Sequence, residues 1–260
     1  MPQEINVVKI QGLGDAQFVN VDTTTTNGIY RARDLGLGSS GLVGLIITPF
    51  VLETSTLFGP TTHRKGRLFA TFRHPLDRAV SMFKYLQYAH WEPTYSPQFK
   101  DWTLEMYATS DQIENNWMTR HLTKTYKADL TIAHLKSAKE VLQTKVLVGL
   151  INRLEESMDR FEAYFGWRFT LNPTEQESCR EGLFTLGTNT NQNTNHKIQK
   201  PKPGSALYDL IMAENKYDME LYQFAVQLFE EQIELLKGAP KEYRLEGSTC
   251  SKCEEDYEKG

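Results

Sequence analysis

The sequence predicts an α/β fold in which helices flank a doubly wound parallel sheet. Short apolar runs alternate along the chain with amphipathic stretches of helical periodicity, which is the pattern of successive strand–helix units. The chain has 260 residues, 40% of them hydrophobic and 24% charged, which is enough for one domain with a core of ordinary size. We expect that domain over residues 1–240 and a charged C-terminal tail over residues 241–260.

The first half of the chain predicts two strands and a helix. Gly36–Gly41 is rich in glycine and predicts a flexible turn that leads into a strand at Leu45–Phe50. The apolar run Leu68–Phe72 predicts a second strand, and the amphipathic helix that follows it passes through Phe83 and Leu86. In a sheet of this kind, ligands bind beyond the carboxyl ends of the strands, where Arg73 lies.

The second half predicts mainly helices around one further strand. Apolar and aromatic residues recur at helical intervals in two stretches, at Ile113, Trp117 and His121 and then at Leu154, Met158, Phe161 and Phe165. The compact apolar run Val146–Ile151 between them is typical of a buried parallel strand. A last long helix is expected to run to about Leu236.

The charge balance limits the classes of ligand. The net charge of -4 excludes binding of polyanions such as nucleic acids by bulk charge, so recognition of phosphate or sulfate has to be local. Two local basic clusters are present, at residues 63–67 and at Lys197, Lys200 and Lys202. Each is equally consistent with a solvated face.

The cysteines and the hydropathy predict neither a disulfide scaffold nor a membrane span. Cys179, Cys250 and Cys253 are too few for such a scaffold, and the Cys250–Cys253 pair lacks the second ligand pair that a structural zinc needs. We therefore expect no metal. No stretch approaches the roughly 20 apolar residues of a transmembrane helix.

Arg73-His-Pro75-Leu-Asp77-Arg78-Ala-Val-Ser81 has the composition of an anion site. Pro75 suits the first helical turn, and the amides behind it place the positive end of the helix dipole toward a phosphate. Arginine adds a charged planar fork and serine a hydroxyl donor, so Arg73 and Ser81 fit a terminal phosphate. The alternative is an ordinary strand-to-helix turn with ion pairs and Asp77 as the local partner.

The pattern R-x-P-x-D-R-x-x-S resembles the segment by which sulfotransferases hold the 3'-phosphate of 3'-phosphoadenosine 5'-phosphosulfate (PAPS). The resemblance implies that Arg73 and Ser81 contact that phosphate. His74 stands where the family often has Asp or Asn. The fold implied is the P-loop NTPase-like fold of sulfotransferases.

Further landmarks resemble the membrane-bound carbohydrate branch, which includes the heparan sulfate sulfotransferases. The stretch from Asn115 to Leu122 is similar to its N-x-x-T-R-x-L helix, so Asn116 and Arg120, four residues apart, are expected on one helix face toward the cofactor or acceptor sugar. The alternative is an internal polar contact that fastens the helix. Later matches are Val148–Leu150, Glu155 to Gly166 and Asn215 to Tyr222, so the likeness covers roughly Leu45 to Gln232 and is closest to small algal-type members.

The resemblance is incomplete at the front of the chain. Family members carry a phosphosulfate-binding loop with Lys or Arg in a Gly/Ser/Thr-rich turn near their first strand. Gly36–Gly41 has no such cation. Two interpretations remain open: the chain begins downstream of that strand, loop and helix, or catalysis has been lost.

The resemblance also points to a base and to further nucleotide contacts. A base that deprotonates the acceptor hydroxyl is expected at Glu53, or second at His63, although either residue can be an ordinary surface residue. Lys197 and Lys200 follow the polar loop 188–195, where relatives fold a basic loop over the nucleotide. The alternative is a plain surface connection.

The activity implied is transfer of the sulfuryl group from PAPS to a hydroxyl of a carbohydrate acceptor, without a metal. Relatives are usually Golgi membrane enzymes, so the resemblance implies the Golgi. One alternative is a noncatalytic nucleotide-binding or interaction protein derived from a sulfotransferase. A P-loop phosphotransferase is disfavoured because the Gly-Lys-Ser/Thr loop is missing.

Overall fold

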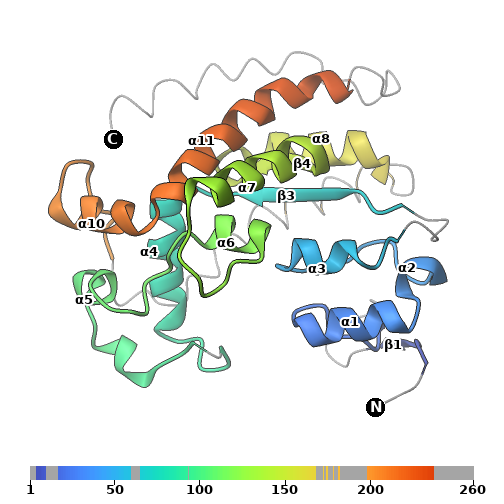
Figure 1. Ribbon diagram of the computed structural model, residues 1–260, viewed down its shortest axis with the longest axis horizontal. Helices are drawn as coiled ribbons and strands as arrows, with labels where there is room; N and C mark the ends of the chain where they lie inside the picture. The colour runs from blue at the N-terminus through green and yellow to red at the C-terminus, as the bar shows by residue number, and fades with distance from the viewer. Residues whose placement is uncertain are drawn as a thin grey trace. The chain divides into compact units, whose positions relative to one another are not determined.

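We describe the protein from a computed structural model, which covers residues 4–9, 17–59, 65–92, 94–167 and 198–236 together with residues 172, 174, 178 and 181 (Figure 1). It is a mixed α/β protein with many helices and two small sheets. The chain divides into two compact units. Unit 1 comprises Met1–Leu68 and Trp117–Val146, and unit 2 comprises Phe69–Asn116 and Leu147–Gly260. The single domain predicted over residues 1–240 stays a prediction.

Unit 1 contains a short antiparallel hairpin and five helices among its described residues. They are β1 (Val7–Lys9), β2 (Gln17–Val19), α1 (Thr26–Asp34), α2 (Leu37–Ser40), α3 (Val51–Ser55), α6 (Trp117–Thr123) and α7 (Ile132–Lys145). Val8 lies opposite Phe18 in the hairpin. Thr25 caps α1 by accepting a hydrogen bond from the Gly28 amide. One cluster of the unit's core consists of Ile29, Ala32, Leu37 and Leu57.

The prediction of a strand at Leu45–Phe50 is wrong. The segment is irregular, and α3 follows it directly. Ile46 and Phe50 pack against the core of unit 1, whereas Leu45 and Ile47 are 51% and 77% exposed. Pro49 has no amide hydrogen to donate to a neighbouring strand, so the apolar run is half buried without strand pairing. The turn predicted at Gly36–Gly41 contains the short helix α2, bounded by these two glycines at φ 75° and 70°.

Unit 2 is built on a two-stranded parallel sheet, β3 (Leu68–Phe72) and β4 (Val146–Leu150). Both strands begin where the chain passes from unit 1 into unit 2. The helical segments of the unit are α4 (Pro75–Leu86), η1 (Pro97–Lys100), α5 (Leu104–Ala108), η2 (Ile151–Arg153), α8 (Leu154–Phe165), α10 (Ala206–Glu214), α11 (Lys216–Glu231) and η4 (Gln232–Leu236). The apolar face of α4 forms a core with α5 and α10, through residues such as Phe83, Tyr107 and Ile211.

Several predicted elements of unit 2 are confirmed. The strand at Leu68–Phe72 has the predicted bounds, and α8 spans the predicted helix. Every residue of β4 is buried as expected, but the strand ends at Leu150, and Ile151 is 39% exposed in η2. The last long helix continues to Leu236 as η4. The helix predicted through Ile113, Trp117 and His121 is wrong at its N-terminal end, because α6 begins only at Trp117.

Two features are absent from the described ranges: a membrane-spanning helix and a metal-binding group of side chains. No helix there is both long and apolar enough to cross a bilayer. No group of three or more His, Cys, Asp or Glu side chains there is placed to hold a metal ion. Cys179, Cys250 and Cys253 lie outside the described residues.

Candidate functional site

The turn from β3 into α4 carries the predicted anion motif and lies in unit 2. Pro75 is the first residue of α4, as expected, and His74 caps the helix. The Leu76 amide donates to His74 Nδ1 at 3.2 Å, and the Arg78 amide donates to the His74 carbonyl at 2.9 Å. The expectation that the amides behind Pro75 are free for a phosphate is therefore wrong for Leu76, whose N–H is already bound.

Arg73 is the available cation of this turn. Its side chain is exposed and makes no hydrogen bond or ion pair in the part of the chain that the structure describes. Arg78, by contrast, donates to Glu114 Oε1 at 2.8 Å. Burial raises the pKa of Glu114 and the neighbouring Arg78 guanidinium lowers it, with a net increase. Arg73 therefore offers an unused guanidinium at the carboxyl end of a parallel strand, where α/β proteins bind ligands.

A second predicted cation approaches the same helix end. The Lys200 ammonium lies 2.7 Å from Asp77 Oδ1, in the first turn of α4. Asp77 and the half-buried Ser81 are four residues apart and share one helix face. Lys200 is thus held at the first turn of α4 through Asp77, on the helix face that Ser81 shares, and Arg73 lies two residues before the helix begins.

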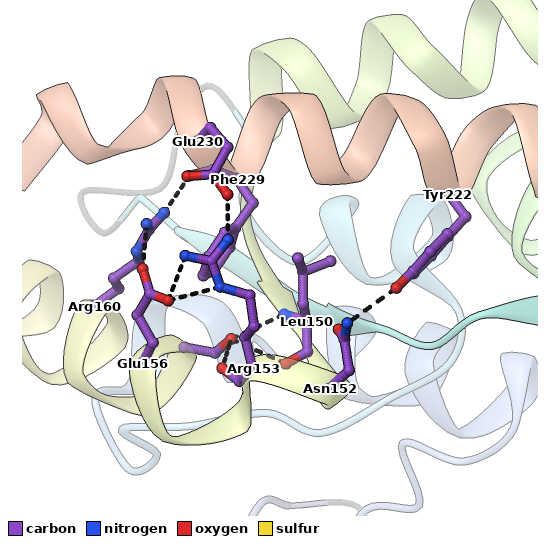
Figure 2. A network of polar contacts seen from close by, with 9 residues as sticks. Leu150, Asn152, Arg153, Glu156, Arg160, Tyr222, Phe229 and Glu230 are labelled. Carbon is purple, nitrogen blue, oxygen red and sulfur yellow. Dashed lines mark hydrogen bonds and ion pairs between the residues drawn. The ribbon is translucent and has the colours of Figure 1, made fainter. Parts of the chain in front are cut away.

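Tyr222 of α11 connects the carboxyl ends of the two parallel strands. Its ring lies edge-on to the His74 ring, with centroids 5.4 Å apart, and its hydroxyl donates to Asn152 Oδ1 at 3.4 Å. Figure 2 shows this contact between α11 and the turn after β4. Tyr222 is buried, so His74 has an apolar neighbour on one side.

The pKa of His74 is lowered chiefly by burial; Lys200 lowers it further, and Asp77 opposes the shift. Because the pKa in the folded state lies below the unfolded value of 6.5, His74 stabilises the fold above pH 6.5, and this contribution is lost as pH falls through the folded pKa. Protonation also puts a hydrogen on Nδ1, which removes the cap of α4. We expect acidification from pH 7 to pH 5 to cost about 1 kcal/mol through this cap, measured by urea unfolding.

The control for this pH dependence is His74→Asn. Asparagine keeps a side-chain acceptor at the cap but does not titrate in this range. The stability of this variant is expected to change less between pH 7 and pH 5 than that of the wild type. Equal changes in the two proteins would assign the pH dependence to other groups.

A network of charged side chains fastens α8 to α11 in unit 2 (Figure 2). Glu156 binds Arg153 through one carboxylate oxygen at 2.5 Å and Arg160 through the other at 2.6 Å. Arg160 also donates to the Phe229 carbonyl and lies over the Phe229 ring at 3.6 Å, while Arg153 pairs with Glu230. Burial lowers the pKa of Arg160, and Glu156 acts in the opposite direction. The network holds the helices that flank the carboxyl end of β4.

Asn116 makes internal contacts. It precedes α6 with a positive φ of 47°, so the prediction that Asn116 and Arg120 share a helix face is wrong. Its Oδ1 accepts from the Tyr217 and Asp218 amides at 2.8 and 3.1 Å, and its Nδ2 donates to the Glu214 carbonyl at 2.8 Å. Asn116 thereby caps α11 from a distant part of the sequence.

Arg120 lies in unit 1 and supports the segment that follows α6. Its guanidinium donates to the carbonyls of Thr125 and Ala128 at 2.9 and 2.8 Å. These bonds are consistent with the alternative interpretation, an internal polar contact that fastens the helix.

Glu53 is buried in unit 1 and is not the surface residue that the alternative interpretation described. It lies in α3, with 1% of its area exposed, and Oε1 accepts from the Tyr126 hydroxyl at 3.1 Å. Lys124 lies 3.6 Å from the same oxygen and donates to the Tyr30 hydroxyl at 2.9 Å. Oε2 has no hydrogen-bond partner among the described residues. Burial and the Glu53 carboxylate raise the pKa of Tyr126. Oε2 is thus a buried oxygen that solvent does not reach.

The remaining predicted site residues lie outside the described residues. These are His63, Lys197 and the polar loop 188–195.

Sequence reasoning missed Tyr222 and Asn152, which meet at the strand ends, and the network around Glu156. The spacing of Arg153, Glu156 and Arg160 by three and four residues is a signal for one helix face that was available in the sequence. No signal in the local sequence pairs Asn152 with Tyr222, because 70 residues separate them.

No family model, no curated protein and no solved structure matches this chain.

Proposed function

We propose that this chain is a carbohydrate-type sulfotransferase domain with the doubly wound, P-loop-like fold of that family, and that Arg73 and Ser81 bind the 3'-phosphate of PAPS. The observation that carries the proposal is Arg73, an exposed guanidinium without a partner among the described residues, at the end of a parallel strand and at the start of a helix. An arginine placed in this way suits a phosphate, because its planar fork donates two hydrogen bonds to one group.

Lys200 is the proposed second cation for the nucleotide. Its ion pair with Asp77 holds the ammonium at the first turn of α4, beside the motif. A phosphate that displaces or joins this carboxylate gains a charge-assisted hydrogen bond. Lys197 remains part of the proposal by resemblance alone.

The proposed reaction moves the sulfuryl group of PAPS to an acceptor hydroxyl and leaves 3'-phosphoadenosine 5'-phosphate (PAP) and a sulfate ester. Glu53 stays the proposed base by resemblance alone, since its side chain is buried within unit 1. Arg120 stays a proposed contact to the sugar by resemblance alone, since its guanidinium donates to the Thr125 and Ala128 carbonyls. We do not carry Asn116 into this role, because its amide group is used in internal hydrogen bonds. The resemblance points to the Golgi as the compartment in which the protein acts.

The second candidate is a noncatalytic nucleotide-binding or interaction protein. It is favoured by the glycine-rich segment Gly36–Gly41, which holds the short helix α2 and contains no cation for a 5'-phosphosulfate. In this second candidate function, the chain binds the 3'-phosphate of a nucleotide but does not transfer a sulfuryl group.

Calorimetric titration with PAP beside adenosine 5'-phosphate (AMP) tests the 3'-phosphate site. We expect PAP to bind more tightly than AMP, and Arg73→Ala to weaken PAP binding roughly tenfold or more while leaving AMP binding almost unchanged, because one charged hydrogen-bonding group is lost. Arg33→Ala is the matched control, since Arg33 is an exposed arginine whose ion-pair partner is its neighbour Asp34.

Equal binding of PAP and AMP by the folded wild-type chain would refute PAPS use by this site. If PAP is preferred and Arg73→Ala removes the preference, incubation with PAPS and a glycan acceptor then separates the two candidates. Formation of PAP and a sulfated glycan supports the transferase, and binding without turnover supports the noncatalytic protein.

A further inference from the structure

Three aromatic side chains gather at the carboxyl-terminal end of α4, in unit 2. Tyr85 lies in the last turn of the helix, and Tyr88 and Trp91 lie in the turns that follow it. The ring centroids are 5.6 Å apart for Tyr85 and Tyr88, and 6.2 Å apart for Trp91 and each tyrosine. The rings meet at 84°, 71° and 65°, so every pair is steeply inclined. Trp91 is 60% exposed and Tyr88 37%.

Hydrogen bonds fix this arrangement. The Trp91 indole N–H donates to the Tyr85 hydroxyl at 2.9 Å, and that hydroxyl donates to Glu92 Oε1 at 2.7 Å. The Ala89 amide donates to the Tyr85 carbonyl, and the Glu92 amide donates to the Ala89 carbonyl. The rings and the carboxylate are therefore ordered before a ligand arrives, which lowers the entropic cost of binding.

The shape of the cluster favours a compact ligand. A sugar ring stacks best on rings that lie in one plane, whereas these three rings are inclined to one another by 65° to 84°. A cation is attracted to an aromatic face over about 6 Å, which is close to the separation of these ring centroids, so one compact group beside the cluster can lie within reach of more than one ring. A rounded group such as trimethylammonium suits such a cluster.

The charges favour a cation. Each ring presents a face with negative potential, and Glu92 adds a carboxylate through its bond to Tyr85. Among the described residues, His90 is the one other ring against this cluster, with its centroid 4.9 Å from that of Trp91, and its Nδ1 lies 3.3 Å from the Tyr88 carbonyl. No lysine or arginine contacts the Tyr85, Tyr88 or Trp91 rings among the described residues.

We propose that Tyr85, Tyr88, Trp91 and Glu92 form a binding site for a quaternary ammonium group of the choline type. The rings supply cation–π attraction, and Glu92 supplies the opposite charge. The proposal uses neither Arg73 nor the nucleotide and is independent of the proposed function.

Titration with choline beside 3,3-dimethylbutan-1-ol tests the charge requirement, because the alcohol has the same shape and no charge. We expect choline to bind at least roughly fivefold more tightly than the alcohol, followed by calorimetry at fixed ionic strength. Glu92→Gln keeps an acceptor for the Tyr85 hydroxyl, removes the charge and should weaken choline binding roughly two- to fivefold. Trp91→Ala should weaken it at least as much.

Trp167→Ala is the matched control, since Trp167 is another exposed tryptophan of unit 2, and it should bind choline as the wild type does. Circular dichroism checks that each variant is folded. Choline binding no tighter than that of the neutral alcohol, or unchanged by Trp91→Ala in the folded protein, overturns the proposal.

Sedimentation with phosphatidylcholine vesicles distinguishes the two sources of the group. Vesicle binding that free choline competes away, and that Trp91→Ala weakens, assigns the site to a lipid headgroup. Choline binding without vesicle binding assigns it to a free small molecule. Both results support the quaternary ammonium site.

Discussion

Replacing Glu156 with glutamine is expected to lower the free energy of unfolding by about 3–5 kcal/mol, because it leaves a buried guanidinium without its anion. Arg160 is 1% exposed and has its carboxylate partner at 2.6 Å in Glu156. Arg153 binds the other oxygen of the same carboxylate. Urea unfolding followed by circular dichroism measures the loss, which should come with an unchanged dependence on urea concentration.

Glu230→Gln is the matched control for this effect. Glu230 pairs with Arg153, but its side chain is 56% exposed, so solvent screens the pair and the expected cost is below about 1 kcal/mol. Similar losses for Glu156→Gln and Glu230→Gln would show that burial of Arg160 does not set the energy of this network.

The second large effect is expected at Asn116. Asn116→Ala should lower the free energy of unfolding by about 2–4 kcal/mol, because it removes a helix cap and leaves buried amides without an acceptor. The Tyr217 and Asp218 amides both donate to Asn116 Oδ1, and the backbone at Asn116 has a φ of 47°, which alanine adopts poorly. Hydrogen exchange at these two amides should become faster together with the loss of stability.

Two control variants separate the causes of this loss. Asn116→Gly accepts the positive φ but lacks the side chain, so it isolates the hydrogen bonds. Asn115→Ala removes the neighbouring amide, whose Nδ2 donates to the half-buried Glu214 carboxylate, and should cost less. If Asn116→Gly were as stable as the wild type, the hydrogen bonds to α11 would contribute nothing.

The helices and strands that could be predicted from the sequence are those in which the pattern of apolar residues within the segment matches its burial. β4 consists of apolar residues that are all buried, and α8 carries its apolar residues at helical spacing. The run Leu45–Phe50 is equally apolar, but Pro49 and the absence of a partner strand among the described residues leave it irregular. Strand formation depends on a neighbour, and that information is not in the run itself.

The candidate site was predictable only where one short motif carries it. Arg73, Pro75 and Asp77 lie at one strand-to-helix turn, so their grouping follows from the local pattern. Asn116 was misplaced because its four-residue spacing from Arg120 suggested a helix, whereas its hydrogen bonds go to residues about 100 positions away. Glu53 was expected as a base, with an ordinary surface residue as the alternative, and α3 buries it against Tyr126. Such long-range pairs are outside the reach of periodicity.

The two units are interleaved along the chain, and this affects the order in which the protein can fold during synthesis. Unit 1 is completed only when α6 and α7 follow the segment 69–116, and α6 packs on α3 within that unit. At the usual rate of synthesis, roughly 5 to 18 seconds pass between the end of α3 and the end of α7, and the apolar side chains of α3 are without those helices for that time. Unit 2 likewise begins before unit 1 is finished. Unit 1 is therefore complete only once Val146 has been made, and unit 2 only later, so chaperones that shield apolar segments have most to cover between the synthesis of Leu68 and Val146.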